Sequence, residues 1–216
     1  VLPRDVVSAT KKALIDYNGT GIGIMEISHR SHAIIDLFQK VNERISGLLK
    51  IPSNYQILWL QGGASLQFSM VPMNILPSGG SADFIETGLW SVKAAKECKK
   101  VGDVKVVASS KERKFSYIPK NYTLNKSSSY LHITSNNTIY GTQYKVFPKV
   151  LPNQVLVADM SSDILSKCIS IRDFGLIYAG AQKNIGPAGV TMVIIRDDLV
   201  GMGLRSIPSM LDYKVH

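Results

Sequence analysis

One lysine in this sequence has surroundings that suit covalent chemistry. Lys183 lies in Tyr178-Ala-Gly-Ala-Gln-Lys-Asn-Ile-Gly-Pro-Ala-Gly189, after an apolar run and before a series of Gly, Pro and Ala residues. Small residues let a ligand approach the backbone, and a lysine amine partly removed from water can act as a nucleophile that forms an imine with an aldehyde. The alternative is a surface lysine beside a turn, because lysines are mostly exposed.

An aspartate precedes this lysine by 24 residues and ends another apolar run, Val155-Leu-Val-Ala-Asp159. Ligands of parallel sheets bind beyond the carboxyl ends of the strands, so Asp159 and Lys183 could face one cleft. A carboxylate in that place can keep the nitrogen of a pyridine ring protonated and so make the ring a better electron acceptor. Asp159 could equally be the N-cap of a following helix.

A glycine pair marks a third position. At Gly62-Gly63-Ala64-Ser65 the chain changes from an apolar, strand-like run to a helix-like pattern. The first N–H groups of a helix and the positive end of its dipole make such a junction suitable for a phosphate. The sequence lacks G-x-x-x-x-G-K-[ST] and G-x-G-x-x-G, which disfavours a nucleotide-binding loop. A tight turn without a ligand is the alternative.

Hydrophobic periodicity predicts an α/β fold in which helices and strands alternate. Apolar residues at helical spacing indicate helices at residues 3–17 and 34–48, and another that begins directly after Gly63. Apolar and aromatic runs indicate strands at 55–61, 83–86, 104–108, 130–134, 155–160, 176–179 and 190–196. We expect one main domain with a mostly parallel central sheet flanked by helices, and a surface connection at 111–129.

Composition disfavours several classes of protein. The longest uncharged apolar runs are strand-sized, far below the roughly 20 residues of a membrane span, and no secretory signal is visible. We therefore expect no membrane partner and a reducing compartment. Cys98 and Cys168 are too far apart for a metal-binding knuckle, and we predict no metal site.

The net charge of +9 is concentrated in residues 93–126, which contain ten Lys or Arg and three acidic residues and so carry a net charge of +7. Nucleic-acid binding is one interpretation. The stretch lacks the interleaved aromatic residues of a recognisable RNA or DNA motif, and solvated lysines on surface helices are commoner. We therefore expect no nucleic-acid partner and keep a basic nucleic-acid binder only as an alternative.

Six motifs together resemble the phosphoserine aminotransferase family. They are Met25-Glu-Ile-Ser-His-Arg30, Gln61-Gly-Gly-Ala-Ser-Leu-Gln-Phe68, Trp90, Asn137-Thr138, Ala158-Asp-Met-Ser-Ser162 and Ala179-Gly-Ala-Gln-Lys-Asn-Ile-Gly-Pro-Ala-Gly189. Their order and approximate spacing run through nearly the whole chain, which makes coincidence implausible. The resemblance implies the large domain of a fold-type I transferase that binds pyridoxal 5'-phosphate and acts as a homodimer.

The resemblance also implies a role for each matched residue. Lys183 would form the Schiff base with the cofactor and carry protons to and from the substrate, and Asp159 would pair with the pyridinium nitrogen. The remaining contacts to the cofactor would come from Ala64, Ser65, Trp90, Thr138 and Gln182. Arg30, with His29 beside it, would meet an anionic group of the substrate. From the residues alone, Trp90 could be a core aromatic and Arg30 part of a surface ion pair.

The activity that the resemblance implies is amino transfer between glutamate and 3-phosphohydroxypyruvate, which gives O-phospho-L-serine and 2-oxoglutarate in serine biosynthesis. We expect a cytoplasmic protein, or one imported into an organelle with its transit peptide removed. Some members carry an arginine at the place of Ser65 that helps to bind the substrate phosphate, so other groups must do this here.

Residues 1–216 would be a large domain without its short N-terminal segment and its C-terminal small domain, and would therefore be a poor enzyme alone. Two alternatives remain within the same fold. One is another fold-type I enzyme, such as an alanine-glyoxylate aminotransferase or a cysteine desulfurase. The other is a non-catalytic homologue that keeps the cofactor site.

Overall fold

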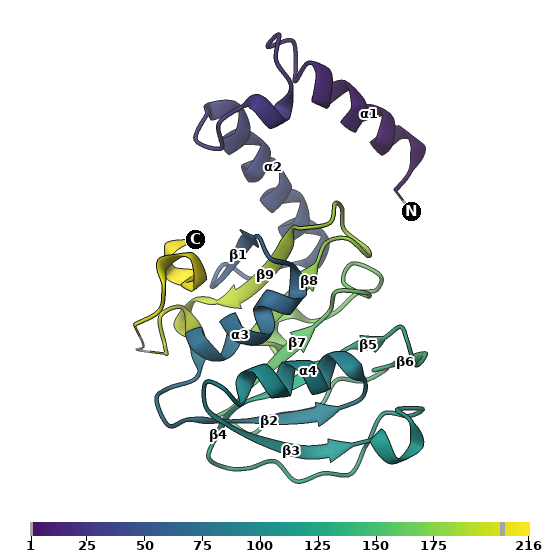
Figure 1. Cartoon of the computed structure of the whole chain (residues 1–216), viewed down its shortest axis with the longest axis vertical. Coiled ribbons are helices and arrows are strands. Elements are labelled where there is room, and N and C mark those ends of the chain that lie inside the picture. Colours follow the sequence, from purple (N-terminus) through teal and green to yellow (C-terminus); the bar gives the residue numbers. More distant parts are fainter. Residues whose placement is uncertain (1, 204–205) are drawn as a thin grey trace. The chain divides into compact units, whose positions relative to one another are not determined.

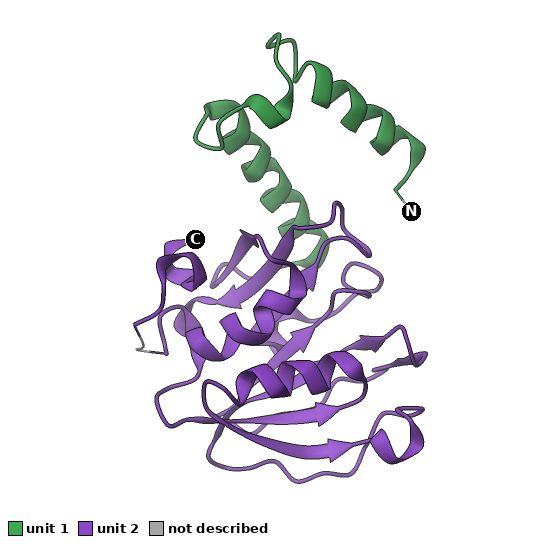
Figure 2. Ribbon diagram, viewed as in Figure 1, with its two compact units in different colours: residues 1–50 green, residues 51–216 purple. Residues whose placement is uncertain are grey.

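The computed structural model describes residues 2–203 and 206–216 and divides into two compact units, residues 1–50 and 51–216 (Figure 2). The first unit is helical and consists of α1 (Arg4–Ile15), the short 3₁₀ helix η1 (Ile24–Glu26) and α2 (His32–Leu49). Helix α1 begins directly after Pro3, which has no N–H to lose at a helix start. Both predicted helices of this region are therefore confirmed, with slightly different ends.

The second unit is built on a seven-stranded sheet in the order β1-β9-β8-β7-β4-β2-β3 (Figure 1). The strands are β1 (Tyr55–Leu60), β2 (Ser81–Glu86), β3 (Asp103–Ser109), β4 (Ser128–Thr134), β7 (Val155–Asp159), β8 (Leu176–Gly180) and β9 (Thr191–Arg196). Strand β9 runs antiparallel to both of its neighbours, β1 and β8, and the other neighbouring pairs are parallel. The predicted mostly parallel sheet is confirmed.

Two helices cover one face of this sheet. Helix α3 (Gly63–Ile75) contacts β8, and α4 (Leu89–Cys98) lies beside α3 and contacts β2 (Figure 1). Their apolar side chains share one core with the strands, in which Phe84, Tyr130 and Tyr178 are fully buried. Helix α3 begins where the sequence predicted it, whereas α4 was not predicted as an element.

A short hairpin follows β4. It pairs β5 (Asn136–Asn137) with β6 (Thr142–Gln143) and forms a separate two-stranded sheet. The other elements of the second unit are single 3₁₀ turns: η2 (Lys111–Arg113), η3 (Ile171–Asp173), η4 (Asp197–Leu199), η5 (Ser209–Leu211) and η6 (Tyr213–Val215). The stretch 111–129 is a mostly exposed connection, as predicted, although Phe115, Pro119 and Ser128 are buried and β4 already begins at Ser128.

Strand direction determines where a site can form. Because β1 and β8 both oppose β9, strands β1, β2, β4, β7 and β8 point the same way and their carboxyl ends meet at one edge of the sheet. That edge is where ligands of open α/β sheets bind. In residues 2–203 and 206–216, none of the helices combines the length and the apolar character that a membrane crossing requires.

Candidate active site

A cavity of about 320 Å³ opens at the carboxyl ends of the strands. Its walls come from the β1–α3 turn, the first turn of α4, the end of β7 and the loop after β8. Six of the residues that the sequence predicted for a cofactor site line it: Ala64, Ser65, Trp90, Asp159, Gln182 and Lys183. The structure therefore brings together residues that lie up to 119 positions apart in the sequence.

Asp159 is the buried charge of the cavity, with 5% of its surface exposed. Its Oδ1 accepts hydrogen bonds from the backbone N–H of Ser161 at 3.0 Å and from the Ser161 hydroxyl at 2.6 Å. Within the described residues its Oδ2 has no hydrogen-bond donor, although the residue lines the cavity. This second oxygen of a largely buried carboxylate is thus available to a cationic N–H group of a ligand in the cavity.

The surroundings of Asp159 act on its protonation in opposite directions. Burial raises the pKa of its carboxyl group, while the hydrogen bonds from Ser161 and the positive charge of Lys183 lower it. The net result is a pKa above the usual value, because burial is the largest of these effects. A ligand that places a positive N–H group against Oδ2 would stabilise the charged carboxylate and so oppose the effect of burial on its pKa.

Lys183 and Trp90 form the opposite part of the cavity wall. The Lys183 Nζ atom lies 5.5 Å from the centroid of the Trp90 ring, within cation–π range. Lys183 itself is exposed, so the interpretation as a solvated lysine beside a turn and the interpretation as a reactive amine both agree with its position. What distinguishes the two is that this ammonium group faces a cavity that also holds the buried carboxylate.

The start of α3 gives the cavity an anion-binding end. Gly62 has φ = 90° and Gly63 has φ = 68°, a left-handed turn that aims the first N–H groups of α3 at the space beyond the sheet. A Cβ atom at Gly62 would lie 2.4 Å from the side chain of Leu66, so glycine is needed there for space as well as for conformation. The first N–H groups of a helix have no partner within it, which suits a phosphate.

Three predicted site residues do not line this cavity. Thr138 is exposed in the turn of the β5–β6 hairpin. His29 and Arg30 are exposed in the turn before α2 and belong to the first unit, so the structure does not relate them to the cavity. Their roles stay predictions.

Ser161 is the site residue that the sequence reasoning missed. Its hydroxyl donates to Asp159 Oδ1 and accepts a hydrogen bond from the backbone N–H of Gly180 at 3.0 Å, so it joins the end of β7 to the end of β8. An aspartate followed two residues later by serine is a common hydrogen-bonded turn, and this spacing was the available signal. The alternative that Asp159 is the N-cap of a helix is wrong, because a hydrogen-bonded turn and not a helix follows β7.

The parallel sheet, the lysine and buried aspartate at its strand ends, and the helix start between them define the class: the fold-type I enzymes that use pyridoxal phosphate. The model of the aminotransferase class-V family matches residues 1–204. The chain therefore belongs to the class-V aminotransferases.

Curated relatives that match the whole of this chain are phosphoserine aminotransferases. The chain is 48% identical to phosphoserine aminotransferase of Alkalihalobacillus alcalophilus and 51% identical to that of Geobacillus kaustophilus, covering 100% of this chain and 60% of each relative. The chain thus spans about 60% of the length of the curated relatives that it matches. These likenesses confirm the predicted resemblance to this family.

Solved structures of phosphoserine aminotransferases are also similar to this chain. Phosphoserine aminotransferase from Bacillus circulans subsp. alkalophilus has a TM-score of 0.95 at 45% identity, over 100% of this chain and 60% of that one. The pyridoxal-phosphate-bound phosphoserine aminotransferase of Trichomonas vaginalis has a TM-score of 0.90 at 31% identity, over 100% and 61%.

Proposed function

We propose that this chain binds pyridoxal 5'-phosphate in the cavity and belongs to a phosphoserine aminotransferase. The observation that carries the proposal is that Lys183 and the buried, half-satisfied carboxylate of Asp159 line one cavity beside a helix start. Relatives of that name match the whole of this chain at about 50% identity. In this proposal residues 1–216 form the cofactor-binding large domain.

The chemistry of the cavity fits the cofactor at both ends. The first turn of α3, with Ala64 and Ser65, and the neighbouring Gln182 would hold the phosphate group. Asp159 Oδ2 would accept a hydrogen bond from the protonated ring nitrogen, because both hydrogen bonds from Ser161 go to Oδ1. Trp90 would contact the face of the ring.

When bound, pyridoxal phosphate supplies an aldehyde carbon and a protonated ring that withdraws electrons from the substrate. Lys183 Nζ would take the proton from the alpha carbon of the amino donor and return it during amino transfer. Asp159 would keep the ring nitrogen protonated, because its charge favours a proton on a group that faces it. Ser161 would hold the Asp159 carboxylate in the orientation that this pairing needs.

The proposed substrates are glutamate and 3-phosphohydroxypyruvate, and the products are 2-oxoglutarate and O-phospho-L-serine. Arg30 and His29 would bind an anionic group of the substrate. Ser65 cannot supply a positive charge for the substrate phosphate, so that charge must come from elsewhere. We further propose a cytoplasmic homodimer, in keeping with the family.

The test uses the natural full-length protein and its Lys183→Ala variant. We expect the wild type to transfer the amino group of glutamate to 3-phosphohydroxypyruvate, faster than to glyoxylate, and borohydride to attach the cofactor to the peptide that contains Lys183. The variant should lose both the attachment and at least about 1000-fold in turnover, because its proton-transferring amine is gone. Lys111→Ala, which changes an exposed lysine of η2, is the matched control.

Two outcomes would contradict the proposal. Attachment and turnover that survive in the Lys183→Ala variant would remove the assigned lysine from the reaction. A wild-type protein that transfers amino groups to glyoxylate but not to 3-phosphohydroxypyruvate would instead indicate another aminotransferase with the same fold.

A further inference from the structure

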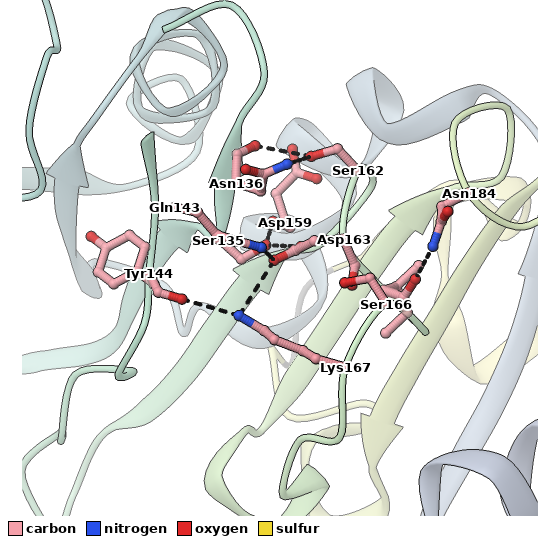
Figure 3. Close-up of polar contacts among 11 residues, drawn as sticks. Ser135, Asn136, Gln143, Tyr144, Asp159, Ser162, Asp163, Ser166, Lys167 and Asn184 are labelled. Atoms are coloured by element: carbon pink, nitrogen blue, oxygen red, sulfur yellow. Dashed lines mark hydrogen bonds and ion pairs between the residues drawn. The ribbon is translucent and has the colours of Figure 1, made fainter. Parts of the chain in front are cut away.

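Another buried carboxylate lies outside the cavity lining, in the loop that follows β7. Asp163 is 5% exposed and accepts hydrogen bonds from the Ser135 hydroxyl at Oδ1 and from Gln143 Nε2 at Oδ2, the latter at 3.0 Å (Figure 3). The Lys167 ammonium lies 3.9 Å from the same Oδ2 and donates to the backbone carbonyl of Tyr144 at 3.0 Å. The cavity does not include Asp163, so its burial has a different purpose from that of Asp159.

These contacts fasten the β5–β6 hairpin to the loop after β7. Gln143 lies in β6, and Ser135 lies directly before β5. The neighbouring Asn136 and Ser162 add two further hydrogen bonds between the same two segments, at 2.9 and 3.0 Å (Figure 3). The backbone N–H of Ser135 also donates to the carbonyl of Asp159 at 2.9 Å, so the attachment reaches the aspartate of the cavity.

The hairpin in turn contacts the start of α4. The Asn137 amide donates to the Thr87 hydroxyl at 3.0 Å. A Cβ atom at Gly88 would lie 2.7 Å from Asn137 Oδ1, so the two segments approach as closely as glycine permits. Since Trp90 is the second residue of α4, a shift of the hairpin would move the turn that places this ring in the cavity wall.

The lysine loop is tied to the same segment. Asn184, which follows Lys183, donates from Nδ2 to the backbone carbonyl of Ile164 at 2.5 Å (Figure 3). Ile164 is fully buried and follows Asp163 directly. One short segment, residues 160–167, therefore contacts the loop of Lys183 on one side and the hairpin on the other.

We propose that Asp163 is a positioning residue, which holds the hairpin and the lysine loop so that Trp90 and Lys183 keep their places in the wall of the cofactor cavity. This inference rests on the function proposed above. A carboxylate suits the task because it accepts hydrogen bonds from two donors, the Ser135 hydroxyl and the Gln143 amide, and its charge also attracts the Lys167 ammonium. An asparagine keeps the shape of this side chain but loses the negative charge that faces the Lys167 ammonium.

The chain offers a test in which donor and acceptor are exchanged. In the natural full-length protein, Asp163→Asn removes the negative charge that faces the Lys167 ammonium, and Gln143→Glu places a second carboxylate against Asp163. The double variant has one carboxylate at this contact again, because the new amide at position 163 can donate to the new carboxylate at position 143 while its carbonyl oxygen still accepts from Ser135. We expect each single change to raise the dissociation constant of pyridoxal phosphate on the order of tenfold, and the double variant to recover most of it.

A second readout does not need the cofactor. Amide hydrogen exchange of the cofactor-free protein should accelerate in residues 136–143 and 183–186 in both single variants and return toward wild type in the double variant. Exchange in β9, which these contacts do not touch, should stay unchanged. Asp173→Asn, an exposed aspartate in the same β7–β8 connection, is the matched control and should behave as the wild type.

Wild-type cofactor affinity and exchange in Asp163→Asn would overturn the inference, and so would single-variant losses that the double variant does not recover. If Asp163→Asn does not fold, Gln143→Glu alone still decides, because the inference requires it to weaken cofactor binding and loosen the hairpin. A failure of the proposed function would appear in a different measurement. Turnover that survives in Lys183→Ala would refute the function, whereas the exchange data would still report on the role of Asp163.

Discussion

Replacing Ser161 by Ala removes a hydroxyl that joins two strand ends. In the wild type this hydroxyl donates to Asp159 Oδ1 at 2.6 Å and accepts from the Gly180 N–H at 3.0 Å. A hydrogen bond to a charged group is worth about 1.5–3 kcal/mol, and an unpaired buried N–H costs about 1–3 kcal/mol. Asp159 and Gly180 both line the cavity, so water can replace part of the lost hydrogen bonding. We therefore expect Ser161→Ala to lower the free energy of unfolding by about 2 kcal/mol.

The assay is thermal unfolding of the cofactor-free protein, followed by titration with pyridoxal phosphate. A loss of about 2 kcal/mol corresponds to a decrease of about 4–8 °C in Tm for a chain of this size. Cofactor affinity should fall as well, since the Asp159 carboxylate loses the group that orients it. Ser166→Ala is the matched control, because its hydroxyl donates to the backbone carbonyl of Asp163 in the same loop and not to Asp159.

The refuting result is specific. If Ser161→Ala and Ser166→Ala lower Tm equally and neither changes cofactor affinity, Ser161 is an ordinary turn residue. The orientation assigned to Asp159 would then have to come from the backbone alone.

Three further predictions concern charge and conformation. Because burial raises the pKa of Asp159, the cofactor-free wild type loses stability as pH rises through the pKa of the folded state. The Asp159→Asn variant lacks this loss, so its stability relative to wild type should increase in urea titrations as pH rises above the ordinary range of a carboxyl group. Burial lowers the pKa of His132 to about 3, so wild-type stability falls as pH decreases from about 6.5, and His132→Gln should flatten this slope by up to about 1.4 kcal/mol per pH unit. A slope that matches the wild type would contradict the prediction. Gly62→Ala should destabilise the protein by at least about 1–2 kcal/mol in urea unfolding, because its φ is 90°. Gly47→Ala in α2 should instead gain up to about 1 kcal/mol, and a loss at both positions would refute the argument.

Hydrophobic periodicity predicted the strands well because all seven are partly or fully buried and rich in apolar residues. The predicted strands 155–160 and 176–179 differ from β7 and β8 by one residue each. The pattern could not reveal that β9 runs antiparallel, because an apolar run is the same in either direction. It also missed α4, in which the lysines of the basic stretch 93–126 alternate with short buried positions such as Ala94, Ala95 and Cys98.

The site was predictable to the extent that its residues follow strand ends. Asp159 is the last residue of β7 and Lys183 lies in the loop after β8, and the parallel direction of these strands places both at the same edge. The contacts of Asp163 could not be predicted, because they depend on how a hairpin and two loops meet in space. Thr138 shows the same limit: its motif was found, but the sequence did not place it in an exposed turn outside the cavity.

The pairing of β1 with β9 has a consequence for how the chain folds during synthesis. Every residue of β1, from Tyr55 to Leu60, pairs with a residue between Thr191 and Arg196. At roughly 5–20 residues per second, the ribosome needs on the order of ten seconds to make the sequence between them. During this time β1 is an apolar strand without its partner, and such strands associate readily with other chains. We therefore expect slow translation or a shortage of chaperones to reduce the yield of this protein through aggregation that begins at β1.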